Sequence, residues 1–186
     1  MNQKTILIII VVLVLGGVGY FFIKSPLTPT TKVDNAQKAD GAFDLYNQTF
    51  TIDGESVTLK NGLAEREAAP GSATKVVTRY FGNEIKGDLT RDGQDDIAYL
   101  VSRETGGTGV FYYAVVAVKT ALGYKTTNAF FVGDRIAPQN NYIVSNELNI
   151  NYAERRPGEE FSVPPSQGAV LLLKVTPDGV LEGLMK

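Results

Sequence analysis

An uncharged, apolar run near the N-terminus constrains this chain more than any other feature. Residues 5–23 (TILIIIVVLVLGGVGYFFI) contain no charged side chain over 19 positions. An α-helix rises about 1.5 Å per residue, so this run would span roughly 28 Å, close to the thickness of the hydrocarbon core of a bilayer. Residues 1–24 are therefore predicted to form one N-terminal transmembrane helix, a signal anchor.

A cleaved signal peptide is the alternative for this segment. Such a peptide has a shorter apolar core, about 7–15 residues, followed by small residues at the cleavage site. Bulky Tyr20, Phe21 and Phe22 stand there instead, and with Lys24 they are typical of an anchor at the membrane interface. Lipid attachment would need a cysteine, and the chain has none. We therefore expect the anchor to be retained.

The run has a leader of four residues on one side and a long region on the other, and this difference in length predicts its orientation. Lys4 precedes it and Lys24 and Lys32 follow, so the count of positive charges is nearly balanced. Long domains are translocated with little regard to their charge. We expect a single-pass protein of the cell membrane whose C-terminal part lies outside the cytoplasm.

The segment after the anchor has the composition of a linker. Residues 25–42 combine prolines, hydroxyl residues and mixed charge without an apolar period. The extracytoplasmic domain is predicted to comprise residues 43–186.

Alternation of apolar and polar residues indicates β-structure in that domain. Residues 49–59 alternate around an Asp53-Gly54 turn, which predicts a β-hairpin. Residues 109–118 (GVFYYAVVAV) are apolar on both faces, which is typical of a central strand covered on both sides. Further strands are predicted at 75–86, 97–101, 148–152 and 169–175.

Helical signals are short by comparison. Residues 62–69 could form two helical turns, ended by Pro70-Gly71. The pattern predicts a mainly β domain of about seven to nine short strands: an antiparallel sandwich, an open barrel or a β-rich α+β fold.

Four aspartates crowd residues 88–96 (DLTRDGQDD). Calcium loops place side-chain oxygens at positions 1, 3, 5 and 9, a backbone carbonyl at 7 and a glycine at 6. The candidate ligands are therefore the side chains of Asp88, Thr90, Asp92 and Asp96 and the carbonyl of Gln94.

This loop resembles the calcium loops of FG-GAP-type repeats and dockerins over about ten residues. It departs from them at Thr90, where Asp or Asn is expected, and at Tyr99, where a bidentate Glu would complete an EF-hand loop. The alternative interpretation is a polar Asp-Gly turn whose aspartates cap their own backbone amides. The sequence leaves both interpretations open.

An ordered series of blocks runs through residues 43–175: FTIDGESVTLKNG, VVTRYFGNEIKGDL, DGQDDIAYL, ETGGTGVFYY, VGDRIAP, NYAERRPGE and PPS. In this series the chain resembles a family of small, uncharacterised bacterial membrane-anchored proteins. In some relatives a similar segment stands ahead of a META domain. The resemblance implies an anchored extracytoplasmic domain and brings no established activity.

Two further motifs have competing interpretations. Residues 104–109 (ETGGTG) lack the lysine of a phosphate-binding loop and lead into a strand, so a hairpin turn is predicted. Asp134, Arg135, Arg155 and Arg156 could form an anion or carboxylate site, because arginine presents a planar fork of donors. Surface ion pairs that close loops are the plainer interpretation.

Composition limits the classes of function. Without histidine or cysteine, the chain lacks the usual base of a serine triad, thiolate nucleophiles and common zinc ligands. Residues 25–186 carry 16 basic and 20 acidic side chains, a balance that disfavours nucleic-acid binding. The sequence predicts a non-enzymatic, tethered binding or structural domain, with calcium as a candidate cofactor and an envelope protein or glycan as partner. The alternative is a carboxylate-dependent cell-envelope hydrolase.

Overall fold

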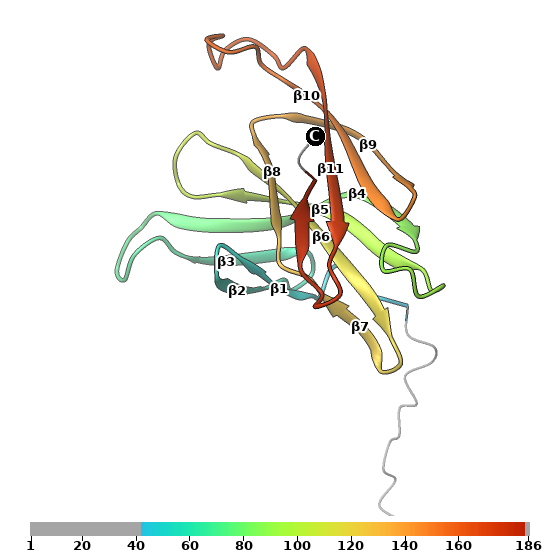
Figure 1. Ribbon diagram of the computed structural model, residues 1–186. Helices are drawn as coiled ribbons and strands as arrows, with labels where there is room; N and C mark the ends of the chain where they lie inside the picture. Colours follow the sequence, from blue (N-terminus) through green and yellow to red (C-terminus); the bar gives the residue numbers. More distant parts are fainter. Residues whose placement is uncertain (1–41, 185–186) are drawn as a thin grey trace, which may run out of the picture. The chain divides into compact units, whose positions relative to one another are not determined.

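The computed structural model describes residues 42–184, and this part of the chain consists of β-strands and loops (Figure 1). The mainly β prediction is confirmed. In chain order the strands are β1 (Thr49–Ile52), β2 (Glu55–Thr58), β3 (Leu63–Glu67), β4 (Lys75–Gly87), β5 (Asp96–Glu104), β6 (Phe111–Thr120), β7 (Gly123–Thr126), β8 (Phe130–Asp134), β9 (Ala137–Val144), β10 (Glu147–Glu154), β11 (Gln167–Val175) and β12 (Leu181–Gly183).

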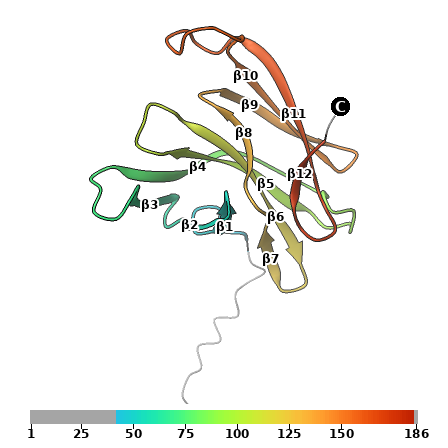
Figure 2. The same cartoon turned by 60° about the vertical axis from the view of Figure 1, so that its left-hand side comes forward.

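These strands form a hairpin and two sheets, in which the named strands pair antiparallel. The larger sheet has the order β3-β4-β5-β6-β7, with β8 also pairing with β6, and the smaller sheet has the order β12-β11-β10-β9. In Figure 2 the smaller sheet lies above the larger one, and the β1–β2 hairpin lies below it. The larger sheet is therefore the middle layer.

Two hydrophobic cores lie on the two faces of this middle layer. Leu100 and Val116 face the smaller sheet, where they pack with Leu148 and Leu173. Their strand neighbours face the β1–β2 hairpin, in a second core formed by Phe50, Ile52, Val57, Leu59, Ile97, Tyr99, Val101, Tyr113, Val115 and Ala117. Strands β5 and β6 are buried on both faces, as residues 109–118 predicted.

The predicted hairpins are present. The β1–β2 turn uses Asp53 (φ 52°) and Gly54 (φ 81°), the positive values that a tight two-residue turn requires. The glycine-rich segment 104–109 joins the antiparallel pair β5 and β6, and Gly106 has a φ of 90°. A Cβ at Gly106 would collide with the side chain of Thr74. These glycines therefore serve backbone geometry.

The helical interpretation of residues 62–69 is wrong. Leu63–Glu67 form β3, which pairs with β4 through Ala64 opposite Thr78 and Arg66 opposite Val76. Helix propensity is a weak preference that pairing with a neighbouring strand overrides. The sequence also underestimated the number of strands, because short or half-exposed edge strands such as β7, β9 and β12 need little apolar alternation.

Side-chain amides join the two sheets at two corners. Asn83 Nδ2 in β4 donates to the carbonyl of Gln139 in β9 at 3.0 Å. At the other corner Asn128 Nδ2 donates to the carbonyl of Leu181 at 3.2 Å, and its Oδ1 accepts from the Leu181 amide at 2.8 Å. These bonds fix how the sheets lie over one another.

Residues 42–184 contain no helix that is long and apolar enough to cross a membrane. The predicted span at residues 5–23 and nearly all of the predicted linker lie outside the described residues.

Candidate functional site

The aspartate loop joins β4 to β5, and its carboxylates bind backbone amides of the same loop. Asp88 Oδ1 accepts from the amides of Arg91 (2.6 Å) and Asp92 (3.2 Å), and its Oδ2 accepts from Gly93 (3.1 Å). Asp92 accepts from both the amide (2.9 Å) and the side chain (3.0 Å) of Gln94. These are the contacts of a self-capped turn.

Asp96, at the end of the loop, is buried and binds the loop to strand β6 through its carboxylate. Its side chain is fully buried, and its two oxygens accept from the amides of Leu89 and Lys119, each at 2.9 Å. Burial raises the pKa of this carboxyl, whereas the two amide donors act in the opposite direction. In the described part of the chain, no three acidic, histidine or cysteine side chains are grouped to hold a metal ion. Calcium binding here stays a prediction.

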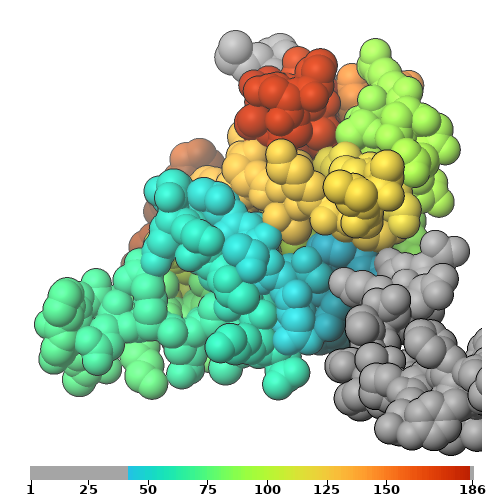
Figure 3. Space-filling model, turned by 90° about the horizontal axis from the view of Figure 1, so that it is seen from below, coloured from blue at the N-terminus to red at the C-terminus, as the bar shows by residue number. Residues whose placement is uncertain are grey.

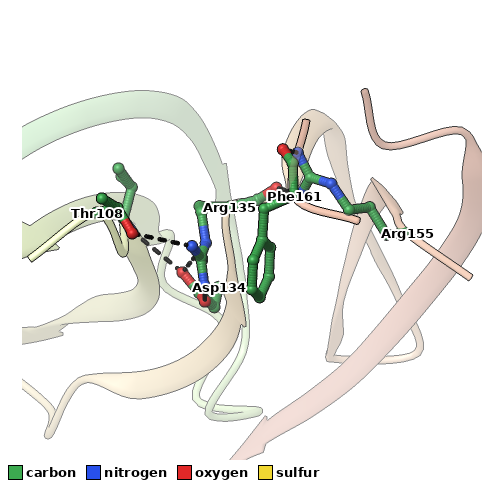
Figure 4. A network of polar contacts seen from close by, with 6 residues as sticks. Thr108, Asp134, Arg135, Arg155 and Phe161 are labelled. Atoms are coloured by element: carbon green, nitrogen blue, oxygen red, sulfur yellow. Dashed lines mark hydrogen bonds and ion pairs between the residues drawn. The ribbon is translucent and has the colours of Figure 1, made fainter. Parts of the chain in front are cut away.

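The structure brings Asp134, Arg135 and Arg155 together around Phe161 (Figure 4). Arg135 Nε lies 3.1 and 3.0 Å from the two oxygens of Asp134, and its Nη1 lies 3.4 Å from Thr108 Oγ1. The Phe161 ring stacks on the same guanidinium, with its centroid 3.5 Å from Cζ. Arg135 is thus held by an ion pair and a cation–π contact.

Arg155 completes this group by tying two loops together. Its three guanidinium nitrogens donate to the carbonyls of Val163 (2.5 Å), Arg135 (2.9 Å) and Phe161 (3.0 Å). Arg156 donates its backbone amide to Glu159 Oε2 at 2.9 Å. Arg135 and Arg155 already bind acceptors of the chain itself. The contacts of this group therefore hold the segment around Phe161 against the β8–β9 turn.

The two sites predicted from sequence lie at opposite ends of the larger sheet. Asp96 begins β5, whereas Arg103 near its other end pairs with Phe111, which pairs with Asp134. Seven residues of a strand span about 23 Å. The aspartate loop and the arginine group therefore do not form one site.

A third place, which sequence reasoning missed, is a cavity of about 160 Å³ between β2 and β3. Figure 3 shows this side of the molecule, where cyan atoms of β2 and teal atoms of β3 flank a hollow. The lining residues are Glu55, Ser56, Val57, Thr58, Ala64, Glu65, Arg66, Val76, Thr78 and Arg103.

Arg103 is the buried charge of this cavity. The residue is only 6% exposed, and its Nη2 donates to Glu55 Oε2 at 2.6 Å. Its Nη1 is also buried and has no hydrogen-bond acceptor within the described residues. A buried donor without an acceptor costs about 1–3 kcal/mol. The guanidinium therefore offers one donor that an added acceptor would satisfy.

Glu55 is shared between two arginines. Besides Arg103, it binds Arg66, which forms an ion pair through Nε and donates from Nη2 at 2.8 Å. The hydrogen bond from Arg66, followed by contacts with Arg103, lowers the pKa of this carboxyl despite partial burial. Two guanidinium groups thus face one carboxylate, which leaves an excess of one positive charge among these three side chains.

The sequence contained one signal for this site, namely that Arg103 lies on the same face of β5 as buried apolar residues. Arg103 follows Ile97, Tyr99 and Val101 at intervals of two residues, and these side chains face the core under the β1–β2 hairpin. An arginine in phase with buried residues requires a carboxylate partner or a ligand. Nothing in the sequence identifies Glu55, 48 residues away, as that partner.

Comparison with family models, with curated proteins and with solved structures gives no significant match. The family resemblance and the calcium-loop resemblance stay predictions.

Proposed function

We propose that this chain is a membrane-tethered extracytoplasmic binding domain that holds a carboxylate group in the cavity beside Arg103. The observation that carries the proposal is Nη1 of Arg103, a buried cationic donor without an acceptor in the described residues. Arginine nitrogens form short, charge-assisted bonds with carboxylate oxygens. Nη1 has almost no accessible surface, so a carboxylate in the cavity would satisfy this donor after a small rotation of the Arg103 guanidinium.

The charge of the cavity favours a carboxylate over a phosphate monoester, which carries nearly two negative charges at pH 7. Arg66 and Arg103 exceed Glu55 by one positive charge, so a monoanion neutralises the three side chains. A dianion would leave a negative charge in a partly buried place, which is unfavourable. Glu65 does not change this balance, because its carboxylate pairs with Lys75 at 3.4 Å.

The size of the cavity limits what enters it. Pockets for whole small-molecule ligands usually measure about 300–1,000 Å³. A cavity of about 160 Å³ accommodates one acidic group rather than an entire metabolite. We therefore expect the acidic group to belong to a larger partner, such as an envelope protein or an acidic glycan.

Sequence supports the tether and the compartment. The uncharged run at residues 5–23 has the length of a membrane span, and a long region follows it. In this arrangement the domain would act close to the outer face of the membrane.

Binding is better supported than hydrolysis. A carboxylate that acts as a general acid near neutral pH needs a raised pKa. The pKa of Glu55 is lowered instead, first by its hydrogen bond from Arg66. Both carboxylates at the cavity, Glu55 and Glu65, are neutralised by basic partners. No observation at this cavity favours the hydrolase.

Titration of the full chain with sodium acetate, in an uncharged detergent and at constant ionic strength, tests the proposal. We expect saturable NMR shifts of the amides of Glu55, Ala64 and Thr78, and their loss in Arg103→Met. Arg79→Met is the matched control, because Arg79 belongs to the same sheet but makes an exposed ion pair with Glu104.

Melting curves of both variants show whether each still folds. Saturable shifts that persist in folded Arg103→Met, or their absence from the wild-type protein, would contradict carboxylate binding at Arg103.

A further inference from the structure

Two strand edges without strand partners flank the Arg103 cavity. Among the described strands, β2 pairs only with β1, and β3 pairs only with β4. The two strands are joined where Lys60 and Leu63 exchange backbone hydrogen bonds of 2.9 and 3.2 Å. Beyond this point β2 and β3 form no further pairs, and the cavity lies between them.

The direction of the free backbone groups follows from these bonds. Backbone groups of successive residues in a strand point to opposite edges. Because Leu63 bonds to Lys60 on the outer edge of β3, the N–H and C=O of Glu65 point to the same outer edge. The Leu59 amide bonds to Gln48 on the β1 side, so the groups of Ser56 and Thr58 point away from β1. Ser56, Thr58 and Glu65 all line the cavity.

Arg103 can reach this edge because small side chains separate it from β3. Ala64, Thr78 and Arg103 stand opposite one another on β3, β4 and β5. The contact of Arg103 with Glu55, which also binds Arg66 of β3, places its guanidinium beside the β3 edge. The unpaired edge of β3, to which a further strand could pair, therefore lies next to the cationic guanidinium of Arg103.

We propose that an extended, acidic peptide segment of a partner protein adds to the free edge of β3 and places one Asp or Glu carboxylate on Arg103. This inference rests on the proposed carboxylate site and names its ligand. Strand addition gains its affinity from backbone hydrogen bonds and its specificity from alternate side chains. Here the Glu65 amide and carbonyl would form the backbone hydrogen bonds. The excess positive charge would select an acidic side chain. A glycan offers no such regular row of backbone groups.

The test uses fluorescence anisotropy with the full chain in uncharged detergent and the peptide Thr-Val-Glu-Val-Thr-amide, which carries fluorescein on its N-terminal amine. We expect replacement of the central glutamate by glutamine to weaken binding about tenfold, which corresponds to about 1.4 kcal/mol. We also expect Glu65→Pro to weaken it about tenfold, because proline removes the outward N–H at an edge position that tolerates it. A melting curve checks that this variant folds.

Two N-methylated peptides distinguish strand addition from simple charge attraction. One carries the methyl group on the amide of the central glutamate, and the other on that of the following valine. Alternate amides of a bound strand face opposite edges, so only one isomer should lose affinity. Equal affinities of the two isomers would overturn strand addition. If acetate still shifts the amides around Arg103, the carboxylate site stands without it; if neither acetate nor peptide binds, both proposals are wrong.

Discussion

Arg103 lies in a strand whose other side chains on the same face are apolar, so its charge has to be balanced within the fold. Glu55 supplies one carboxylate and Arg66 competes for it. Removing one partner of a buried ion pair is costly because the remaining charge stays desolvated. Glu55 is therefore the residue on which the local stability of the cavity depends most.

We expect Glu55→Gln to lower the free energy of unfolding at pH 7 by about 1–2 kcal/mol, the range for a partly exposed hydrogen bond to a charged group. The pKa of Glu55 is lowered in the folded protein, so the stability it contributes is present above its unfolded value near 4.5 and is lost as pH falls below it. The difference between the wild-type and variant proteins should therefore shrink at acid pH.

Urea denaturation at pH 7 and pH 4 measures this difference. Glu65→Gln is the control, because Glu65 makes a more exposed pair with Lys75 and should cost less than about 0.5 kcal/mol. An equal loss at both pH values would show that Glu55 acts through packing rather than through its charge.

Single elements show where local pattern is sufficient and where it is not. Residues 109–118 predicted a doubly covered strand because burial on both faces leaves an apolar run in the sequence itself. Leu63–Glu67 lack such a run, since β3 is an edge strand whose Glu65, Arg66 and Glu67 are exposed. Its conformation is decided by pairing with β4 and not by its own residues.

For the candidate sites too, local pattern was sufficient for some residues and not for others. The sequence identified the aspartate loop because its residues are contiguous, and it grouped Asp134, Arg135 and Arg155 on chemistry alone. It could not predict that Phe161 stacks on Arg135, or that the carbonyls of two loops take the donors of Arg155. Contacts between distant segments depend on the fold as a whole, so the pairing of Glu55 with Arg103 was missed.

The aspartate loop gives a prediction at the scale of one element. The calcium hypothesis predicts that millimolar calcium raises the melting temperature relative to chelator, because dissociation constants of about 10⁻⁴–10⁻³ M suit extracellular sites. Millimolar calcium is about 1–10 times such a constant, so the gain is roughly 0.4–1.4 kcal/mol, or up to several degrees. Asp92→Ala should abolish the response. Identical melting with calcium and chelator would leave the amide contacts of Asp88 and Asp96 as the whole role of these carboxylates.

At the scale of the whole molecule, both cores and the candidate sites are built on the middle sheet. It separates two cores and carries a candidate site at each end of β5. Within residues 42–184, the side chains of both cores come from Phe43 to Leu181, so this part of the chain has a hydrophobic interior. Apolar burial is the main favourable term in folding, so this interior is the reason to expect that this part of the chain folds by itself. The boundary near residue 43 stays a prediction.

We therefore expect the domain to fold without the predicted anchor. We expect a shortened chain that starts near Asp40 to give a β-type circular dichroism spectrum and one cooperative melt, because its two cores share strands β5 and β6 and cannot unfold separately. Its melting temperature should match that of the domain in the full chain under the same uncharged detergent, and only the full chain should sediment with membranes. Two separate transitions would show that the core between the two sheets and the core facing the β1–β2 hairpin unfold independently. A lower melting temperature for the shortened chain would mean that residues 1–39 contribute to folding, a role beyond that of the predicted anchor and linker.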